Sequence, residues 1–371
     1  MAHDCKTWAS GTCISQPNPM NFFEQLGLFA LRQIDPERAH MLAIKALQLG
    51  LTKTEKPFTS DRLKTEISGL KLPNPIGLAA GFDKNAQALV GLAKSGFGFI
   101  EVGAATPLPQ LGNPKPRLFR LSQDQAVINR FGFNNDGIER IAERLSSRPE
   151  SMVTGLNLGA NKKNHDPSAD FAKVLIQCAP HVDFATVNVS SPNTEKLRDL
   201  QGKELLSSLL DIVMETRDAL KKPIPIFLKI APDLDKTALE NITEIALTHK
   251  IDAIIATNTT LERTGLDSNH RNQAGGLSGK PLFEISTRIL AQMAKLLEGK
   301  IPLIGVGGVS SANDAYDKIC AGASAIQLYT ALVYQGMSLP IYISRELDSI
   351  LEQNGHSKIS QAVGSKIEEW L

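Results

Sequence analysis

The stretches "PLIGVGG" (302–308) and "AIQLYTA" (325–331) decide the fold. Each is a short apolar run of strand length that ends in glycine or in small and polar residues, and a segment long enough for a helix separates them. Short buried strands that alternate with helices are typical of parallel β-α units. The two stretches therefore predict one such unit.

The same unit recurs along the chain. Six earlier apolar runs have similar lengths and endings: "PIGLAAG" (75–81), "FGFIEVG" (97–103), "TGLNLG" (154–159), "FATVNVS" (184–190), "PIFLKIAP" (225–232) and "AIIATNTT" (253–260). Eight β-α units predict an α/β protein with a closed (β/α)8 fold, the TIM barrel. A doubly wound sheet is the alternative, although no G-x-G-x-x-G opens a helix after the first strand. The longest insertions, 104–153 and 261–300, are predicted to be functional.

Composition narrows the class of protein. The chain has 371 residues, 42% of them hydrophobic, which suffices for one large core or two ordinary domains. Lys and Arg total 40 against 39 for Asp and Glu, so a net charge of +1 gives no reason to expect a nucleic-acid partner. The four cysteines are scattered without a C-x-x-C pair, so we expect no metal site, no disulfide framework and a reducing compartment.

The N-terminal part differs from the barrel. Residues 1–20 fit neither a secretory signal nor a mitochondrial presequence, and we expect a disordered or non-native lead-in. Residues 21–52 predict a hairpin of two short helices with much apolar surface, the second starting at the N-cap Asp35 and Pro36. This hairpin either packs against the main domain or forms a membrane-surface patch, since no apolar run reaches the roughly 18–20 residues that span a bilayer. Residues 53–371 predict the barrel domain.

The candidate site follows from the barrel, because the carboxyl ends of all strands meet at one face. Amides, hydroxyls and glycines dominate there, with two lysines: Ala80, Gly81, Lys84, Glu101, Ala104, Asn157, Asn188, Ser191, Asn193, Lys229, Thr257, Asn258, Thr259, Gly307, Gly308, Tyr329 and Thr330. Several amides at one mouth suit a flat ligand with many hydrogen-bonding groups, because each amide both donates and accepts. The carboxylate and histidine ligands of a metal site are missing.

A second pattern points to phosphate. Gly307 and Gly308 let backbone N–H groups approach an anion, a short helix after the eighth strand could direct its N-terminus there, and Gly279 offers another close approach. Phosphate beside a flat polar ligand suggests flavin mononucleotide (FMN), with Lys229 near the electron-rich end of the ring. The alternative is ordinary tight turns and a snorkelling lysine, which the apolar strand around Lys229 disfavours.

Nine motifs resemble, in order and spacing, the class 2 (quinone-linked) dihydroorotate dehydrogenases. They are "LAAGFDKNA", "FGFIEVGAATPLPQLGNPKPRLFRL", "INRFGFNN", "NVSSPNT", "KIAPD", "IIATNTT", "GGLSGKPL", "GVGGVSS" and "GASAIQLYT". The resemblance covers about residues 35–330. It implies an FMN enzyme that oxidises (S)-dihydroorotate to orotate in pyrimidine (UMP) biosynthesis. A hydride goes to flavin N5, a proton to Ser191, and a membrane quinone reoxidises the flavin.

The resemblance also assigns residues. It implies one FMN per chain, with contacts at Ala80, Gly81, Lys84, Ala104, Asn157, Asn188, Lys229, Thr257, Gly279, Gly308, Tyr329 and Thr330. Its substrate contacts fall on Lys84, Asn129, Arg130, Phe131, Gly132, Phe133, Asn188, Asn193, Asn258 and Thr259. Many members carry Ser or Thr at the position of Ala104, so only a backbone contact is expected there.

The class assignment depends on Ser191 and on the hairpin. Class 1 relatives carry cysteine where this chain has Ser191, so the serine indicates class 2. No histidine lies near Ser191 in the sequence to activate it as a base. By resemblance the hairpin forms a quinone tunnel, with His40 and Arg120 at its inner end; the other interpretation of His40 is a helix-surface histidine. We expect a peripheral protein on the cytoplasmic side of a bacterial cell membrane, without an obligatory protein partner.

Two other functions are compatible with the sequence. A soluble dihydroorotate dehydrogenase would use fumarate, or NAD through an iron–sulfur partner, and would lack quinone activity. A barrel without catalytic activity would bind a phosphorylated ligand at the glycine turn, and the purified protein would be colourless. The visible spectrum separates this last reading from a flavoenzyme.

Overall fold

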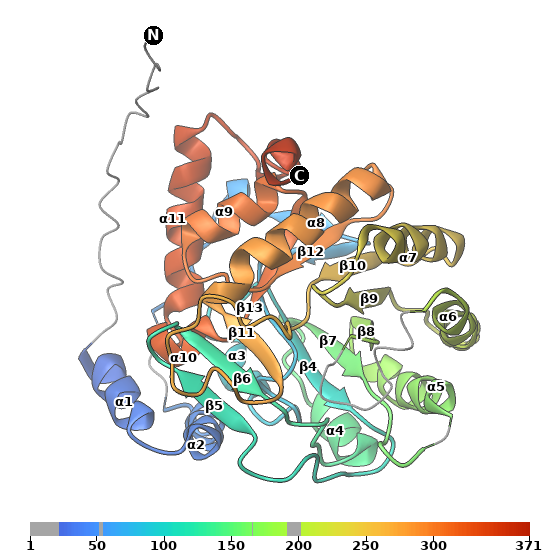
Figure 1. Cartoon of the computed structure of the whole chain (residues 1–371), viewed down its shortest axis with the longest axis horizontal. Coiled ribbons are helices and arrows are strands. Elements are labelled where there is room, and N and C mark those ends of the chain that lie inside the picture. The colour runs from blue at the N-terminus through green and yellow to red at the C-terminus, as the bar shows by residue number, and fades with distance from the viewer. Residues whose placement is uncertain (1–21, 52–54, 165, 191–201) are drawn as a thin grey trace.

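An eight-stranded parallel barrel forms the centre of the molecule in a computed structural model that describes residues 22–51, 55–164, 166–190 and 202–371 (Figure 1). The strand order around the barrel is β10-β12-β13-β3-β4-β7-β8-β9, and it closes on itself. The strands are β3 (Ile76–Leu78), β4 (Phe99–Ala105), β7 (Val153–Leu158), β8 (Phe184–Asn188), β9 (Ile226–Ile230), β10 (Ala253–Ala256), β12 (Leu303–Val306) and β13 (Ala323–Leu328). Each of the eight predicted apolar runs overlaps one of them, so the (β/α)8 prediction is confirmed. The predicted lead-in, Ser191 and Asn193 lie outside the described residues.

Helices surround the barrel (Figure 1). They are α3 (Leu89–Leu92), α4 (Ile138–Leu145), α5 (Pro167–Cys178), α6 (Lys203–Asp218), α7 (Lys236–Thr248), α8 (Phe283–Leu297), α9 (Ala312–Cys320), α10 (Ala331–Gln335) and α11 (Leu339–Gln353). In α8 the side chains of Ile289, Leu290, Met293 and Leu297 are buried, at the spacing of one helical face. The main core lies between such faces and the outside of the barrel.

Aromatic side chains fill the inside of the barrel. The rings of Phe184 and Phe227 stack with centroids 4.5 Å apart, and Phe99 meets Phe184 edge-on at 6.3 Å. Glycines on the neighbouring strands make room for them: a Cβ at Gly77 would lie 2.3 Å from Phe99, and one at Gly155 would lie 2.1 Å from Phe184. The barrel interior is thus a packed core rather than a pore.

A small hairpin that the sequence does not predict closes the end of the barrel where the strands begin. Its strands are β1 (Thr65–Ile67) and β2 (Leu70–Leu72), which pair antiparallel. Ser68 and Gly69 connect them with φ values of 50° and 83°, the positive values that a tight two-residue turn requires. Ile67 and Leu72 pack into the same cluster as the three barrel phenylalanines.

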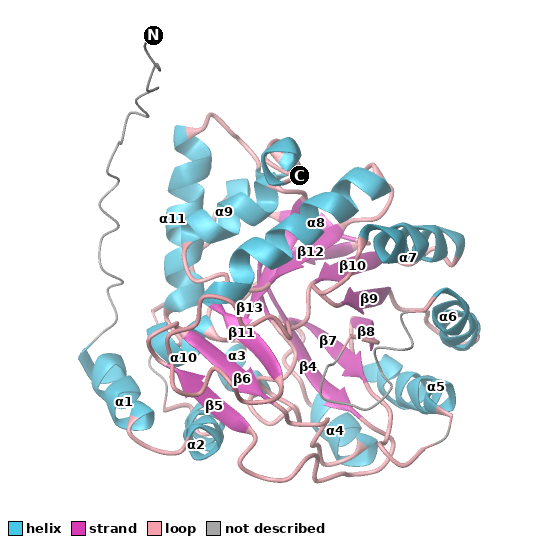
Figure 2. Cartoon of the chain, viewed as in Figure 1, coloured by secondary structure: helices cyan, strands magenta, loops and turns pink. Residues whose placement is uncertain are grey.

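The two long insertions combine into a second, antiparallel sheet, which Figure 2 shows beside the barrel. Its order is β11-β6-β5, with β5 (Leu118–Leu121) and β6 (Ala126–Asn129) from the first insertion and β11 (Gly276–Gly279) from the second. Residues from both insertions line the cavity described below, as expected for functional loops.

The predicted helical hairpin is present as α1 (Phe22–Arg32) and α2 (Pro36–Gln48), beside α10 and β5 (Figure 1). Asp35 caps α2 as predicted, because its carboxylate accepts a 2.9 Å hydrogen bond from the Arg38 N–H. All 11 residues of α1 are at least partly exposed, and Phe22 and Phe23 are 71% and 81% exposed. Among the described helices none has both the length and the apolar character needed to cross a membrane.

Candidate active site

One cavity of about 700 Å³ extends from the carboxyl ends of the barrel strands to the helical hairpin. All twelve residues predicted to hold FMN line it. Lys84 and Asn188 belong also to the predicted substrate set, and six further predicted substrate residues line the cavity: Asn129, Phe131, Gly132, Phe133, Asn258 and Thr259. The predicted quinone-site residues His40 and Arg120 also line it. The barrel mouth and the hairpin therefore share one cavity.

Arg130 does not line the cavity with the other predicted substrate residues. Its guanidinium packs 4.6 Å from the centroid of Phe119 and donates hydrogen bonds to the Gln273 side chain and the Ala274 carbonyl. The side chain is thus held by the second insertion. The other members of this segment, Asn129, Phe131, Gly132 and Phe133, line the cavity.

A chain of buried amides begins at the Glu101 carboxylate on β4. Asn157 and Gln327 each donate a 2.7 Å hydrogen bond to it, one to each oxygen. Asn157 then accepts from Asn188 at 2.9 Å, and Asn188 accepts from Asn258 at 3.2 Å. Because a carboxylate only accepts, it fixes which way each successive amide points.

Lys229 reaches this polar layer from β9, as the sequence predicts. The residue is 5% exposed, and burial lowers the pKa of its ammonium group, whereas the nearby Glu101 carboxylate raises it. The cationic end of a buried lysine therefore has a counter-ion on the barrel floor, which explains how an apolar strand tolerates it.

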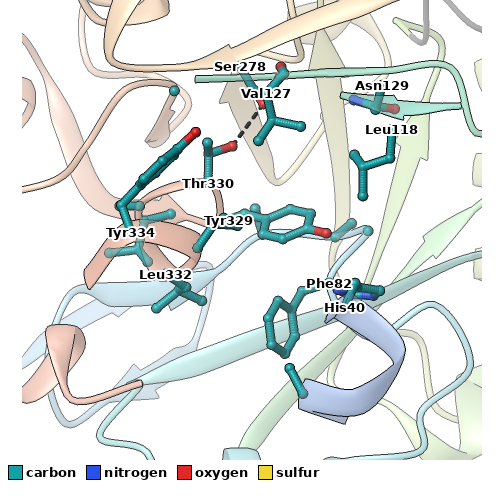
Figure 3. A pocket seen from close by; sticks show the side chains of 18 of the residues that line it. His40, Phe82, Leu118, Val127, Asn129, Ser278, Tyr329, Thr330, Leu332 and Tyr334 are labelled. Atoms are coloured by element: carbon teal, nitrogen blue, oxygen red, sulfur yellow. Dashed lines mark hydrogen bonds between the residues drawn. The ribbon is translucent and has the colours of Figure 1, made fainter. Parts of the chain in front are cut away.

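The predicted phosphate turns have the backbone that only glycine adopts easily. The φ values are 118° at Gly307, 76° at Gly308 and 101° at Gly279. A Cβ at Gly308 would lie 2.5 Å from Phe283, so the turn is also packed closely against the start of α8. The hydroxyls of Ser278 and Thr330, which line the cavity together with these glycines, are hydrogen-bonded to each other at 2.8 Å (Figure 3).

Lys84 follows β3, the strand beside β13 in the barrel. Its ammonium group donates a 2.7 Å hydrogen bond to the Gly81 carbonyl and sits 4.1 Å from the centroid of the Phe131 ring. Burial and the charge of Arg117 lower its pKa, and Glu37 and Asp83 raise it, with a net lowering to about 8. Lys84 is therefore a cation that titrates within an accessible pH range.

The hairpin end of the cavity is mostly apolar and aromatic. The imidazole of His40 contacts the rings of Phe82 and Tyr329, with centroids 5.5 and 6.2 Å away (Figure 3). Burial, together with the charge of Lys84, lowers the pKa of His40 to about 3, so the ring is neutral at physiological pH. Arg120 donates a 2.8 Å hydrogen bond to the Arg32 carbonyl at the end of α1. His40 thus faces the cavity rather than the helix surface.

Two residues of this site were given no role from the sequence. Glu101 stood among the strand ends, and Gln327 lies in the eighth strand; both are fully buried. The signal was present, because a charged or amide side chain inside an apolar strand needs a partner. The same argument that singled out Lys229 applies to them.

The fold and this site define a (β/α)8-barrel enzyme whose active site lies at the carboxyl ends of the strands. The family model for dihydroorotate dehydrogenase matches residues 62–351. A protein from Cereibacter sphaeroides named dihydroorotate dehydrogenase (quinone) is 59% identical over 353 residues, which are 95% of this chain and all of that protein. The mitochondrial quinone enzyme of mouse is 47% identical over 344 residues, 90% of this chain and 87% of that protein.

A solved structure agrees with these matches. DHODH from Eimeria tenella in complex with ferulenol superposes with a TM-score of 0.87 at 36% identity, covering 91% of this chain and 98% of that one. The chain belongs to the dihydroorotate dehydrogenase family, in its quinone-dependent class.

Proposed function

We infer that this chain carries out the reaction of its family, the oxidation of dihydroorotate to orotate in pyrimidine biosynthesis, with a quinone as electron acceptor. The observation that carries this assignment, besides family membership, is the single cavity that joins an amide-lined barrel mouth to an apolar hairpin. A polar substrate and an apolar acceptor need such different surroundings at two ends of one space.

FMN is the cofactor that we propose for the barrel mouth. The carbonyl oxygen of Gln327 is buried, lines the cavity and has no hydrogen-bond partner among the described residues, because Glu101 fixes its amide. Such an acceptor suits a flat ligand with ring N–H groups. Gly279, Gly307 and Gly308 would hold the phosphate with backbone N–H groups, and Lys229 would supply a cation at the ring. Bound there, FMN would supply the hydride acceptor.

Substrate binding is assigned to the residues around Lys84. Its ammonium group would pair with the substrate carboxylate, since it is a buried cation at the cavity wall. The amides of Asn129, Asn188 and Asn258 would donate to and accept from the ring amide groups and hold the ring flat. Asn193 would complete this set and lies outside the described residues.

Ser191 is the proposed base that removes the substrate proton. Support comes from its place in the sequence, three residues after the end of β8, and from Ser190, whose hydroxyl is buried and donates a 3.0 Å hydrogen bond to Asn188. The chain therefore leaves the barrel at the level of the amide layer, where the substrate ring is proposed to lie. Asn258 also donates 3.0 Å to the Ser190 hydroxyl, which fixes this strand end.

The hairpin is proposed as the quinone entrance and the membrane contact. Its exposed apolar side chains, among them Phe22, Phe23 and Phe29 on α1 and Leu42 on α2, form a surface of the kind that inserts into a lipid interface. An apolar quinone tail would pass between the helices, and His40 and Arg120 would meet the head group. We propose peripheral attachment to the cytoplasmic side of a bacterial cell membrane.

Purification of the protein tests this proposal. The flavin function predicts a yellow protein that releases one FMN per chain on denaturation. A soluble acceptor would instead give turnover with fumarate and no response to quinone. A colourless protein that does not bind added FMN would refute the cofactor assignment.

A further inference from the structure

A buried ion pair connects α2 of the hairpin to the barrel. Glu37 is 9% exposed and Arg117 6% exposed. The guanidinium donates to the carboxylate from Nη2 at 2.8 Å and from Nε at 3.2–3.3 Å. Lys115, which is more exposed, adds a contact of 3.3 Å. Burial raises the pKa of Glu37, but Arg117 and Lys115 outweigh it and hold that pKa below its ordinary value.

The other side of Arg117 fixes the loop that precedes it. Its Nη1 donates to the carbonyls of Leu111 at 2.5 Å and Asn113 at 3.0 Å. Its guanidinium also lies 5.5 Å from the centroid of the Phe131 ring. Arg117 thus donates hydrogen bonds to Glu37 on one side and to this loop on the other.

The loop in turn holds the segment proposed to contact substrate. The Asn113 side chain donates a 3.0 Å hydrogen bond to the Arg130 carbonyl, and the Asn113 N–H donates 2.9 Å to the Phe131 carbonyl. Gly132 is packed so closely that a Cβ there would lie 2.8 Å from the Asn113 side chain. A continuous path of hydrogen bonds therefore runs from Glu37 to Phe131.

We propose that Glu37 is a positioning residue for substrate binding, acting through Arg117 and Asn113 on the Arg130–Gly132 segment that forms one wall of the substrate site. The inference rests on the proposed function, since it takes Lys84 and this segment as the place where the dihydroorotate ring binds. It makes the hairpin part of the substrate site as well as the quinone entrance.

The charge of Glu37 supports the same role. The charges of three groups shift the pKa of Lys84: Glu37, Asp83 and Arg117. Lys84 in turn lowers the pKa of His40. Glu37 and Asp83 raise the pKa of Lys84, while Arg117 lowers it. Loss of the Glu37 charge alone leaves Arg117 uncompensated beside Lys84, and two neighbouring cations favour the neutral lysine.

Other residues of α2, Ala39, His40 and Ala43, line the hairpin end of the cavity. One helix is therefore linked to both ends of the cavity, to the substrate segment through Arg117 and to the hairpin end directly. A shift of α2 would reach the substrate segment through Glu37 and the quinone site through His40.

The test compares Glu37→Gln with Glu24→Gln in the full-length flavoprotein. Gln keeps the shape and removes the charge. Glu24 is the matched control on α1, since its carboxylate accepts a 2.9 Å hydrogen bond from the Ser338 N–H and anchors the hairpin elsewhere. The measurement is orotate affinity, read from the perturbation of the flavin absorption spectrum at several pH values. We expect about tenfold weaker orotate binding in Glu37→Gln and unchanged binding in Glu24→Gln.

The pH profile separates positioning from general loosening of the fold. In the wild type, affinity should fall as Lys84 loses its proton above pH about 8. This pH, above which the orotate affinity falls, is the break in the profile. In Glu37→Gln the break should move to lower pH. A break that stays in place, or an orotate affinity equal to the wild type, would overturn the proposal.

A second variant covers the case in which Glu37→Gln does not fold. Asn113→Ala leaves the ion pair and the backbone hydrogen bond to Phe131 intact, and it removes the side-chain hydrogen bond to the Arg130 carbonyl. It should weaken orotate binding at all pH values without moving the break, and wild-type affinity in Asn113→Ala would also overturn the proposal. A wild-type protein without flavin or without an orotate response would instead refute the proposed function.

Discussion

Gln327 on β13 donates a 2.7 Å hydrogen bond to Glu101 on β4, past the intervening strand β3. The second oxygen of the carboxylate accepts from Asn157 at 2.7 Å. One buried carboxyl group therefore orients amides on the strands to either side of β4. The direction of every later hydrogen bond, through Asn188 to Asn258, follows from it.

Replacement of Glu101 by Gln should disrupt this layer. The new NH₂ group meets an amide donor on one side, so a buried donor is left without an acceptor, at a cost of about 1–3 kcal/mol. Chemical denaturation should show this loss of unfolding free energy, and the variant should retain less FMN. Glu143→Gln, at an exposed carboxylate, is the control and should be neutral. A Glu101→Gln protein with wild-type stability and flavin content would contradict the assignment.

Gly308→Ala tests the phosphate turn. The φ of 76° and a Cβ only 2.5 Å from Phe283 should together cost about 3 kcal/mol and reduce FMN affinity. Gly299→Ala is a matched control with the same φ of 76° and open space around the Cβ. It should lose about 1–2 kcal/mol of stability and bind FMN normally. Equal FMN affinity in the two variants would argue against a phosphate at Gly308.

The barrel could be predicted because its strands are local apolar runs between helices. "PLIGVGG" and its seven counterparts carry that pattern within a few residues each. The β11-β6-β5 sheet could not be predicted, since it joins segments of two separate insertions and Gly276 pairs with Asn129, far away in the sequence. The β1–β2 hairpin was missed although Ser68 and Gly69 are ordinary turn residues.

The pH dependence of substrate binding should report Lys84. Burial lowers its pKa to about 8, so the ammonium group is charged below that pH and neutral above it. The KM for dihydroorotate should be constant below pH 8 and then rise about tenfold per pH unit. Lys84→Gln should have a high KM without this break. A wild-type KM that stays flat through pH 9 would remove Lys84 from the substrate carboxylate.

Arg120→Gln should affect the quinone half-reaction. The guanidinium holds the Arg32 carbonyl at 2.8 Å and lines the hairpin end of the cavity. Its loss should raise the KM for quinone about tenfold, because a charge-assisted hydrogen bond disappears. Steady-state assays with a water-soluble dye as acceptor should show an unchanged KM for dihydroorotate. An equal change in both KM values would show that Arg120 does not act at the quinone end alone.

The sequence predicts which residues form the site, but it does not predict their hydrogen-bond and ion-pair partners. Strand ends and family motifs brought together Lys84, Asn188, Lys229 and the glycine turns, since a barrel places all strand ends at one face. The side chain of Arg130 could not be placed, because its direction depends on Gln273 and Ala274 in another insertion. Glu37 and Arg117 form their pair only when the hairpin docks.

Ser191→Ala tests the proposed base. FMN should stay bound, while reduction of the flavin by dihydroorotate should slow by about 100- to 10,000-fold, the contribution of a general base. Ser190→Ala is the neighbouring control, since that hydroxyl bonds to Asn188 within the protein. Stopped-flow rates for the two variants decide between the serines, and wild-type rates in Ser191→Ala would refute the assignment.

The most direct measurement mixes the purified protein with dihydroorotate in the absence of oxygen and follows the visible flavin absorption. The account predicts that the flavin band is bleached with one equivalent of orotate formed per chain, and that a quinone added afterwards restores it. A band that dihydroorotate does not bleach, or a reduced flavin that quinone does not reoxidise, would contradict the central claim.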